Sequence, residues 1–215
     1  MNEYLKVVEK YYSKDPKKYH TYWHITNLFE LYDRHKEKFH KEFPTLSENT
    51  LFEAIAWHDC VYIPGCPMNE EFSAQLYERY YINLEAKERA NGATNMDLVV
   101  KGCLMNLGVY KAILSTKIGH EKFETPEQKV LHDLDWSGFC NYYHKMLENE
   151  EKILYEATCD GRYNVKEVRK NQLNFYKFIV DKDIYVTETF KNLHCNETAK
   201  RNLEKRIKEM ENENI

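Results

Sequence analysis

The sequence predicts an all-α fold, and two observations support this prediction. Apolar residues recur with the spacing of a helix along most of the 215-residue chain. Only 7 glycines and 5 prolines occur, whereas a protein with many tight turns needs more of both. With 42% hydrophobic and 31% charged residues, the composition is that of an ordinary globular protein. We therefore expect one helical domain over residues 1–215.

The expected helices follow one another with short breaks. They cover residues 19–40, 46–58, 69–90, 98–118, 126–135, 139–157, 165–180 and 187–210, after an N-terminal helix that ends before Asp15-Pro16. Thr45 and Glu48 match a capping box for the helix 46–58, and Asn69 is expected to cap the helix 69–90. An interruption of the helix 98–118 is expected near Gly108. The polar tail 208–215 is expected to fray.

Charge and hydropathy exclude several classes of partner. The net charge is -4, and no basic block predicts binding to a long nucleic acid. No run approaches the roughly 20 apolar residues that a membrane span needs, and no signal-peptide segment follows Met1. The six cysteines form no CxxC pair. We expect a cytoplasmic protein with free thiols that binds a small molecule, and the pattern leaves homo-oligomer formation open.

A histidine and an aspartate end the apolar run 54–57. His58 and Asp59 are costly to bury unless they are paired, hydrogen-bonded or bound to a metal. Successive residues of a helix point about 100° apart, so we expect these two side chains to contact each other poorly. Both can still reach a metal ion that lies between their directions. The sequence therefore predicts a metal site whose other ligands come from different helices.

Two segments offer the remaining ligands. His20 and His24 lie four residues apart and share one helix face, and Asp133 and Asp135 lie where the helix 126–135 ends. Imidazole and carboxylate ligands without thiolate suit a divalent ion such as Mn, Fe, Co, Ni, Zn or Mg. Such an ion lowers the pKa of a bound water towards about 7, which provides hydroxide at neutral pH.

Seven motifs along the chain carry a family resemblance. They are "YHTYWHI" (19–25), "WHDCVY" (57–62), "NEEFSA" (69–74), "STKIGH" (115–120), "DLDWSG" (133–138), "GRY" (161–163) and "AKRNL" (199–203). In this order they resemble the HD superfamily of metal-dependent phosphohydrolases, in particular its branch of small HD phosphohydrolases. The resemblance implies an HD-domain helical bundle. It also implies a hydrolase that cleaves a phosphoester or phosphoanhydride bond by attack of metal-bound water, on a nucleotide or a related small phosphate.

The resemblance also assigns metal ligands. They are His24, His58, Asp59 and Asp135. His24 is preferred over His20 because an apolar residue follows the family's first ligand four positions on, which leaves His20 as a substrate contact or a support for the ligand. Asp135 is preferred over Asp133 because the family's last ligand directly follows a small or apolar residue.

Other residues are candidates for proton transfer and phosphate binding. Glu70 or Glu71 can return a carboxylate towards the bound water, although acids also favour a helix N-terminus on their own. Candidate phosphate contacts are Lys117, His120 and Arg162, and His120 is also a candidate for a second metal site. Phe72 and Glu148 depart from the family pattern. These departures keep an alternative open, in which the chain is a nucleotide-sensing binding module without turnover.

Overall fold

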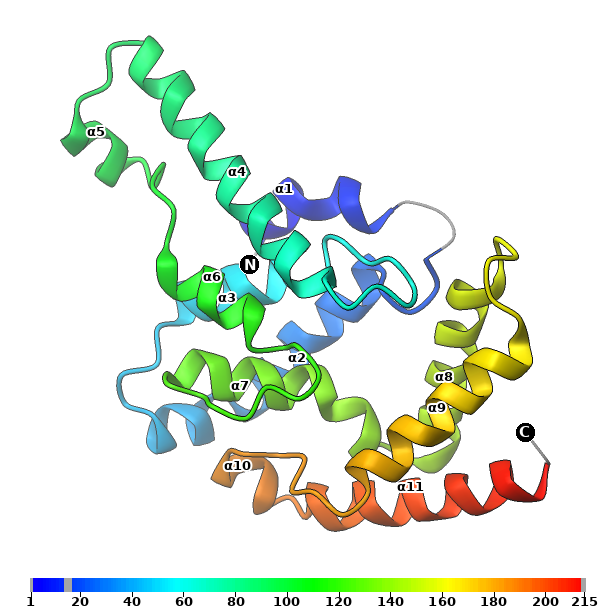
Figure 1. Ribbon diagram of the computed structural model, residues 1–215. Helices are drawn as coiled ribbons and strands as arrows, with labels where there is room; N and C mark the ends of the chain where they lie inside the picture. Colours follow the sequence, from blue (N-terminus) through cyan, green and yellow to red (C-terminus); the bar gives the residue numbers. More distant parts are fainter. Residues whose placement is uncertain (1, 14–16, 214–215) are drawn as a thin grey trace. The chain divides into compact units, whose positions relative to one another are not determined.

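The computed structural model describes residues 2–13 and 17–213. Within them the chain forms eleven α-helices and one 3-10 helix, and no β-strand (Figure 1). This confirms the all-α prediction. The chain divides into two compact units, one made of Met1–Tyr11 and Ser47–Leu131 and the other of Tyr12–Leu46 and His132–Ile215.

The first unit is built around two short apolar helices. Helix α3 (Glu48–Trp57) and helix α6 (Leu107–Leu114) pack against each other, and both pack against α4 (Asn69–Ala90). Apolar residues lie on nearly all sides of α3, as is typical of a buried helix. This unit also contains α1 (Asn2–Tyr12), α5 (Asn95–Val100) and the start of α7 (Pro126–Asp135).

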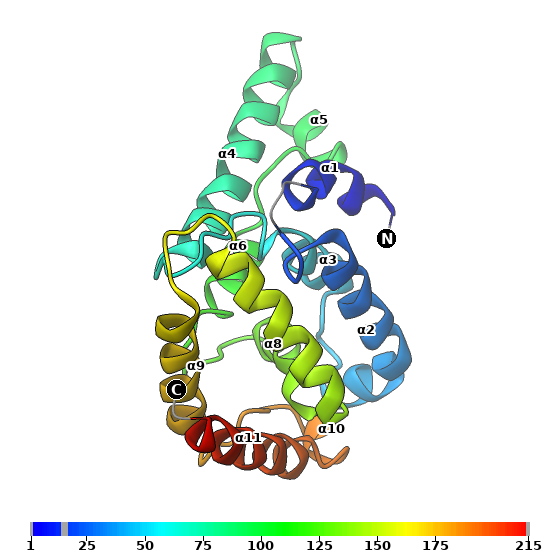
Figure 2. The same ribbon diagram turned by 90° about the vertical axis from the view of Figure 1, so that its right-hand side faces the viewer.

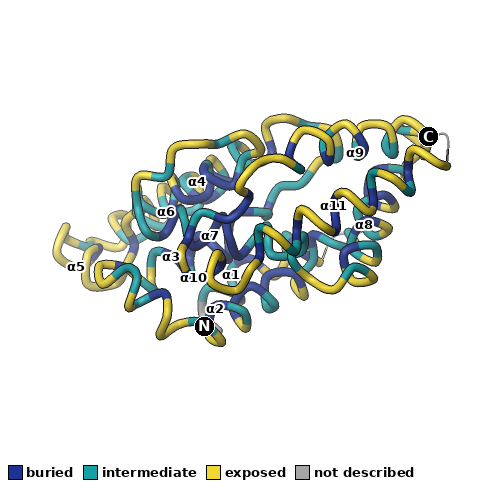
Figure 3. Tube along the Cα trace, turned by 90° about the horizontal axis from the view of Figure 1, so that it is seen from below, coloured by how far each residue is buried: buried dark blue, intermediate teal, exposed yellow. Residues whose placement is uncertain are grey.

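The second half of α4 and the helix α5 extend away from α3 and α6 (Figures 1 and 2). Their residues are mostly exposed, and the exposed colour dominates this part of the trace in Figure 3. Leu98 is an exception with 0% exposure. Helix α5 begins with a capping box, because Thr94 accepts from the Asp97 backbone N–H while Asp97 accepts from that of Thr94. This extension adds little to the core of its unit.

The second unit consists of helices from both ends of its sequence. They are α2 (Tyr22–Glu42), the 3-10 helix η1 (Trp136–Cys140), α8 (Tyr143–Thr158), α9 (Val165–Ile179), α10 (Glu188–Lys191) and α11 (Cys195–Asn212). Helix α11 packs against η1 and α9, and α8 also packs against η1 and α9. Helix α10 contacts α2, so the segment before residue 46 joins the C-terminal helices.

Several predicted helix starts were wrong. Helix α2 begins at Tyr22 rather than at residue 19. Ser47, not Thr45, caps α3, with its Oγ accepting from the Thr50 N–H at 3.3 Å. The predicted helix over residues 139–157 begins only at Tyr143, because the preceding residues form η1.

Two predicted helices are interrupted. The segment 98–118 is broken between Val100 and Leu107, which confirms the predicted interruption near Gly108. The segment 187–210 is broken at His194, which has the left-handed φ of 56°. Helix α11 continues to Asn212, so residues 208–212 are not frayed. The predicted break at Asp15-Pro16 and residues 214–215 lie outside the described residues.

Two predictions about the whole chain can also be compared with the structure. None of the helices in the described ranges is long and apolar enough to cross a bilayer. All six cysteines lie within the described part of the chain and are free thiols.

Candidate metal centre

His58 follows the last residue of α3 and is buried, with 1% of its surface exposed. Its Nδ1 donates to the carbonyl oxygen of Ile55 at 2.9 Å. A carbonyl can only accept, so Nδ1 carries the proton and the Nε2 lone pair is the one that suits a metal. This backbone contact therefore fixes the tautomer that a metal ligand needs.

Asp59 lies in the turn that follows, and its Oδ2 is 3.1 Å from Nε2 of His58. The prediction that these neighbours contact each other poorly was wrong. The two side chains approach each other although His58 keeps helical backbone angles, with φ of -59° and ψ of -36°. The His-Asp dipeptide thus presents a nitrogen and an oxygen to the same point.

Helices α2 and α7 supply a second pair of this kind. His24 lies in the first turn of α2 and is 4% exposed, and Asp135 is the last residue of α7. Nε2 of His24 lies 3.3 Å from Oδ1 of Asp135. The ring of Tyr19 packs against His24 with ring centroids 4.9 Å apart, which restrains the imidazole.

The four predicted ligands form a His/Asp group that could hold a metal ion. His24, His58, Asp59 and Asp135 each offer one ligand atom, and these atoms all lie within 4.8 Å of one another. Two imidazole nitrogens and two carboxylate oxygens suit a divalent transition metal. This His/Asp group can therefore hold a metal ion.

Asp133 is engaged elsewhere. Its Oδ1 accepts from the Val186 N–H at 2.9 Å, and its Oδ2 accepts from the N–H and the hydroxyl of Thr187 at 2.8 and 2.6 Å. Burial raises the pKa of Asp133 to about 7, although the hydrogen bonds from Thr187 and Val186 act in the opposite direction. This carboxyl group fixes the chain before α10.

His20 is held by a glutamate that sequence reasoning missed. Nδ1 of His20 lies 2.6 Å from Oε2 of Glu156, and Oε1 accepts from the N–H groups of Tyr19 and His20 at 2.6 and 3.0 Å. Burial alone would raise the pKa of Glu156, but His20 and the backbone donors more than offset it and lower that pKa. The sequence signal was a glutamate on the buried face of α8, which predicts a partner.

The loop after Asp59 is tied to the start of α4. Asn69 does not cap this helix; its Oδ1 accepts from the Ile63 N–H at 2.9 Å and its Nδ2 donates to the Ile63 carbonyl at 3.0 Å. The hydroxyl of Ser73 accepts from the Val61 N–H at 3.0 Å. Gly65 adopts the left-handed φ of 73° in the same loop. The asparagine and serine of "NEEFSA" thus fix the loop, which sets the position of the glutamates between them.

Glu70 and Glu71 differ in their surroundings. Glu71 forms an ion pair with Lys117; burial acts against this effect, but the ammonium group still lowers the pKa of Glu71. Burial raises the pKa of Glu70, and the negative charges of Asp59 and Glu71 add to the rise. The negative charge of the candidate ligand Asp59 therefore acts on Glu70. Of the two glutamates, Glu70 binds a proton more readily than Glu71.

The other candidate contacts have local partners. Lys117 pairs with Glu71. His120 donates from Nε2 to the Lys122 carbonyl at 2.8 Å. Arg162 is exposed and pairs with Asp160. His120 and Arg162 therefore remain predictions as phosphate contacts.

Comparisons with known proteins identify no relative. No family model, curated protein or solved structure matches the chain.

Proposed function

We propose that the chain is a metal-dependent phosphohydrolase that cleaves a phosphoester or phosphoanhydride bond, with a nucleotide or a related small phosphate as substrate. One observation carries the proposal: His24, His58, Asp59 and Asp135 place their ligand atoms within 4.8 Å of one another. The HD-like order of motifs in the sequence supports the same reaction.

Each part of the centre has a task in this reaction. A divalent ion held by the four residues would acidify a bound water and polarise the phosphoryl oxygens. Glu70 accepts the proton of the attacking water, because its pKa is raised by burial and by nearby carboxylates, which brings it closer to neutral pH. The bond between His58 Nδ1 and the Ile55 carbonyl keeps the imidazole in the metal-binding tautomer.

The alternative is a binding module that keeps the metal group without turnover. Hydrogen-bonded His-Asp pairs alone would also place a nitrogen about 3 Å from an oxygen. The grouping of two histidines with two aspartates is what supports a metal centre. A buried His-Asp pair that serves only as a hydrogen bond is complete without a second histidine or a second aspartate beside it.

The experiment is a metal and substrate screen of the purified protein. Metal-free protein is supplied with Mn, Co, Ni or Mg and assayed for release of inorganic phosphate or pyrophosphate from nucleotides and simple phosphoesters. We expect turnover with at least one metal and none in the presence of a chelator. A protein that binds the metal but releases nothing from any substrate would contradict the hydrolase proposal and favour the binding module.

Two variants control the screen. Asp59→Ala should abolish both metal binding and turnover, because it removes a ligand. Asp181→Ala, which removes an exposed aspartate paired with Lys200, should change neither. Loss of turnover in both variants would show that the effect does not come from the metal group.

A further inference from the structure

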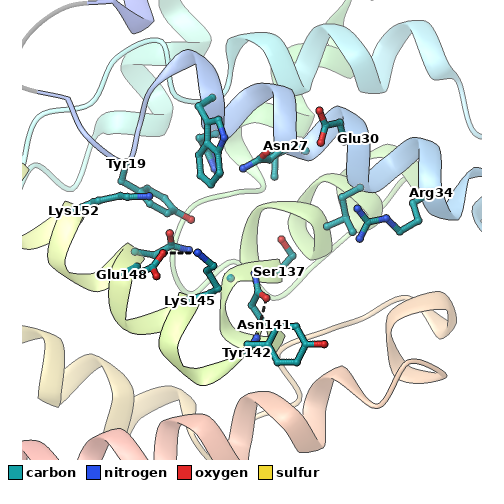
Figure 4. Close-up of a pocket in the computed structure, with 16 residues that line it drawn as sticks. Tyr19, Asn27, Glu30, Arg34, Ser137, Asn141, Tyr142, Lys145, Glu148 and Lys152 are labelled. Carbon is teal, nitrogen blue, oxygen red and sulfur yellow. Dashed lines mark hydrogen bonds and ion pairs between the residues drawn. The ribbon is translucent and has the colours of Figure 1, made fainter.

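The second unit contains a cavity whose wall includes a candidate metal ligand. It has a volume of about 450 Å³ and is lined by α2, by the η1 region and by α8 as far as Lys152 (Figure 4). His24 lies in this wall, and its Nε2 is 3.3 Å from Asp135. A cavity of this size accommodates a small organic molecule. A molecule in it would therefore contact the proposed catalytic centre.

The lining of the cavity is rich in groups that both donate and accept hydrogen bonds. The neutral ones are Asn27, Asn141, Asn149, Ser137, Tyr19 and Tyr142. Tyr19 extends its hydroxyl towards Ser137 and Lys145 in Figure 4. Amides and hydroxyls of this kind match a ligand with several hydroxyl or amide groups. An apolar ligand would cover the side-chain amides of Asn27 and Asn149 without bonding to them, which is costly.

The charged groups of the lining nearly balance. Three cations, Arg34, Lys145 and Lys152, stand against two acids, Glu30 and Glu148. Lys145 pairs with Glu148 at 2.8 Å. Such a lining gives little net attraction for several phosphate groups. We therefore place the neutral part of the substrate here and its scissile phosphate at the metal group.

A large aromatic side chain completes the cavity. Trp23 lines it and is 55% exposed, although an indole is one of the most favourable groups to bury. Lys152 Nζ lies 4.7 Å from the centre of this ring, which polarises the indole. An exposed indole beside amides and hydroxyls is suited to contact with the face of a ring.

We propose that this cavity binds the organic group of the substrate, a ring that carries hydroxyl groups, as in a nucleoside or a sugar. The ring packs on Trp23, and the hydroxyl groups bond to the asparagine side chains, Asn27 among them. This inference rests on the proposed function, because it takes the phosphate to lie at His24. It adds the residues that select the substrate, which the sequence did not indicate.

The test is calorimetric titration of the chelator-treated full-length protein with compounds that lack a phosphate. The probes are adenosine, guanosine, cytidine, uridine, ribose and glucose. We expect at least one probe to bind with a Kd of about 1 mM or tighter. Trp23→Ala should weaken that binding about tenfold, and Asn27→Ala should weaken it severalfold. Binding of nucleosides alone identifies a nucleotide as the substrate, whereas binding of a sugar alone identifies a sugar phosphate.

Phe178→Ala is the matched control. Phe178 is 54% exposed and has Lys182 over its ring at 3.7 Å, but it lies outside the cavity. The Phe178→Ala variant should bind the same probe with an affinity within twofold of the wild type. The inference is overturned if no probe binds, if both cavity variants bind like the wild type, or if Phe178→Ala weakens binding as much as Trp23→Ala.

Because binding of these probes needs neither metal nor turnover, an active hydrolase that binds none of them refutes this inference alone. A protein that binds the probes but never hydrolyses a phosphoester refutes only the proposed function.

Discussion

Among single residues, the two glutamates that follow Asn69 show how neighbouring carboxyl groups acquire different properties. Glu71 pairs with Lys117, and this ammonium group holds the pKa of Glu71 below its usual value in spite of burial. Burial and nearby carboxylates raise the pKa of Glu70. A general base works best when its pKa approaches the working pH, so Glu70 is the better proton acceptor.

Glu70→Gln should keep the metal and lower kcat by about a hundredfold or more, whereas Glu71→Gln should lower kcat by less than about tenfold.

The wild-type rate should fall as the pH drops through the pKa of Glu70, because only the deprotonated carboxylate accepts a proton. That pKa lies above the ordinary 4.5, so the fall begins at a higher pH than for an unperturbed glutamate. Steady-state rates over a pH series measure both effects, and equal rates in wild type and Glu70→Gln would refute the assignment.

Glu156 makes a pH-dependent contribution to stability. Its pKa is lowered in the folded state, so the stabilisation is complete above the unfolded-state pKa and is lost as the pH falls through the lower, folded-state value. We expect Glu156→Gln to reduce the free energy of unfolding by about 2 kcal/mol at pH 7 and by less at about pH 3. Urea denaturation at the two pH values measures this, and a difference that does not depend on pH would contradict it.

Among the helices, α10 depends on carboxylates from other elements. It has 4 residues, too few for a helix to be stable by itself. Glu42, at the end of α2, accepts from the N–H groups of Glu188 and Thr189 at 2.7 and 2.9 Å. Asp133 of α7 accepts from Thr187 directly before it. The charged acceptors favour a helix N-terminus at this point.

Asp133→Asn and Asp135→Asn should therefore have opposite effects. Asp133→Asn should reduce the free energy of unfolding by about 2 kcal/mol, because the amide NH2 would face the N–H of either Val186 or Thr187. The folded variant should still bind metal. Asp135→Asn should keep the stability and lose the metal. Denaturation and metal analysis of both variants measure this, and a pattern with the two roles exchanged would make Asp133 the ligand.

The sequence predicted most helices but not all of their ends. Helix α4 matches its predicted span of 69–90, because periodicity and the preceding loop residues are local signals. The choice of Ser47 over Thr45 as a cap is not local, since Oε1 of Glu127 binds the N–H of Ser47 at 2.7 Å. The break at His194 is also invisible locally, because most helix breaks with positive φ use glycine.

For the whole molecule, the candidate centre could be foreseen only in part. The end of an apolar run indicated His58 and Asp59, because such groups need partners when buried, whereas the choice of Asp135 over Asp133 came from the family resemblance. The pairing of Glu156 with His20 and the cavity beside Trp23 could not be foreseen, because they depend on which helices pack together. The division into two compact units also lacks a sequence signal such as a flexible linker.

Titration calorimetry with Mn²⁺ tests the central claim most directly. The protein is first freed of metal, and wild type is compared with His58→Ala and with Asp181→Ala as the control. The account predicts saturable binding with one strong site per chain in wild type and in Asp181→Ala. It predicts at least a tenfold weaker affinity in His58→Ala, with helical content retained. Absence of binding in folded wild type, or unchanged affinity in His58→Ala, would contradict it.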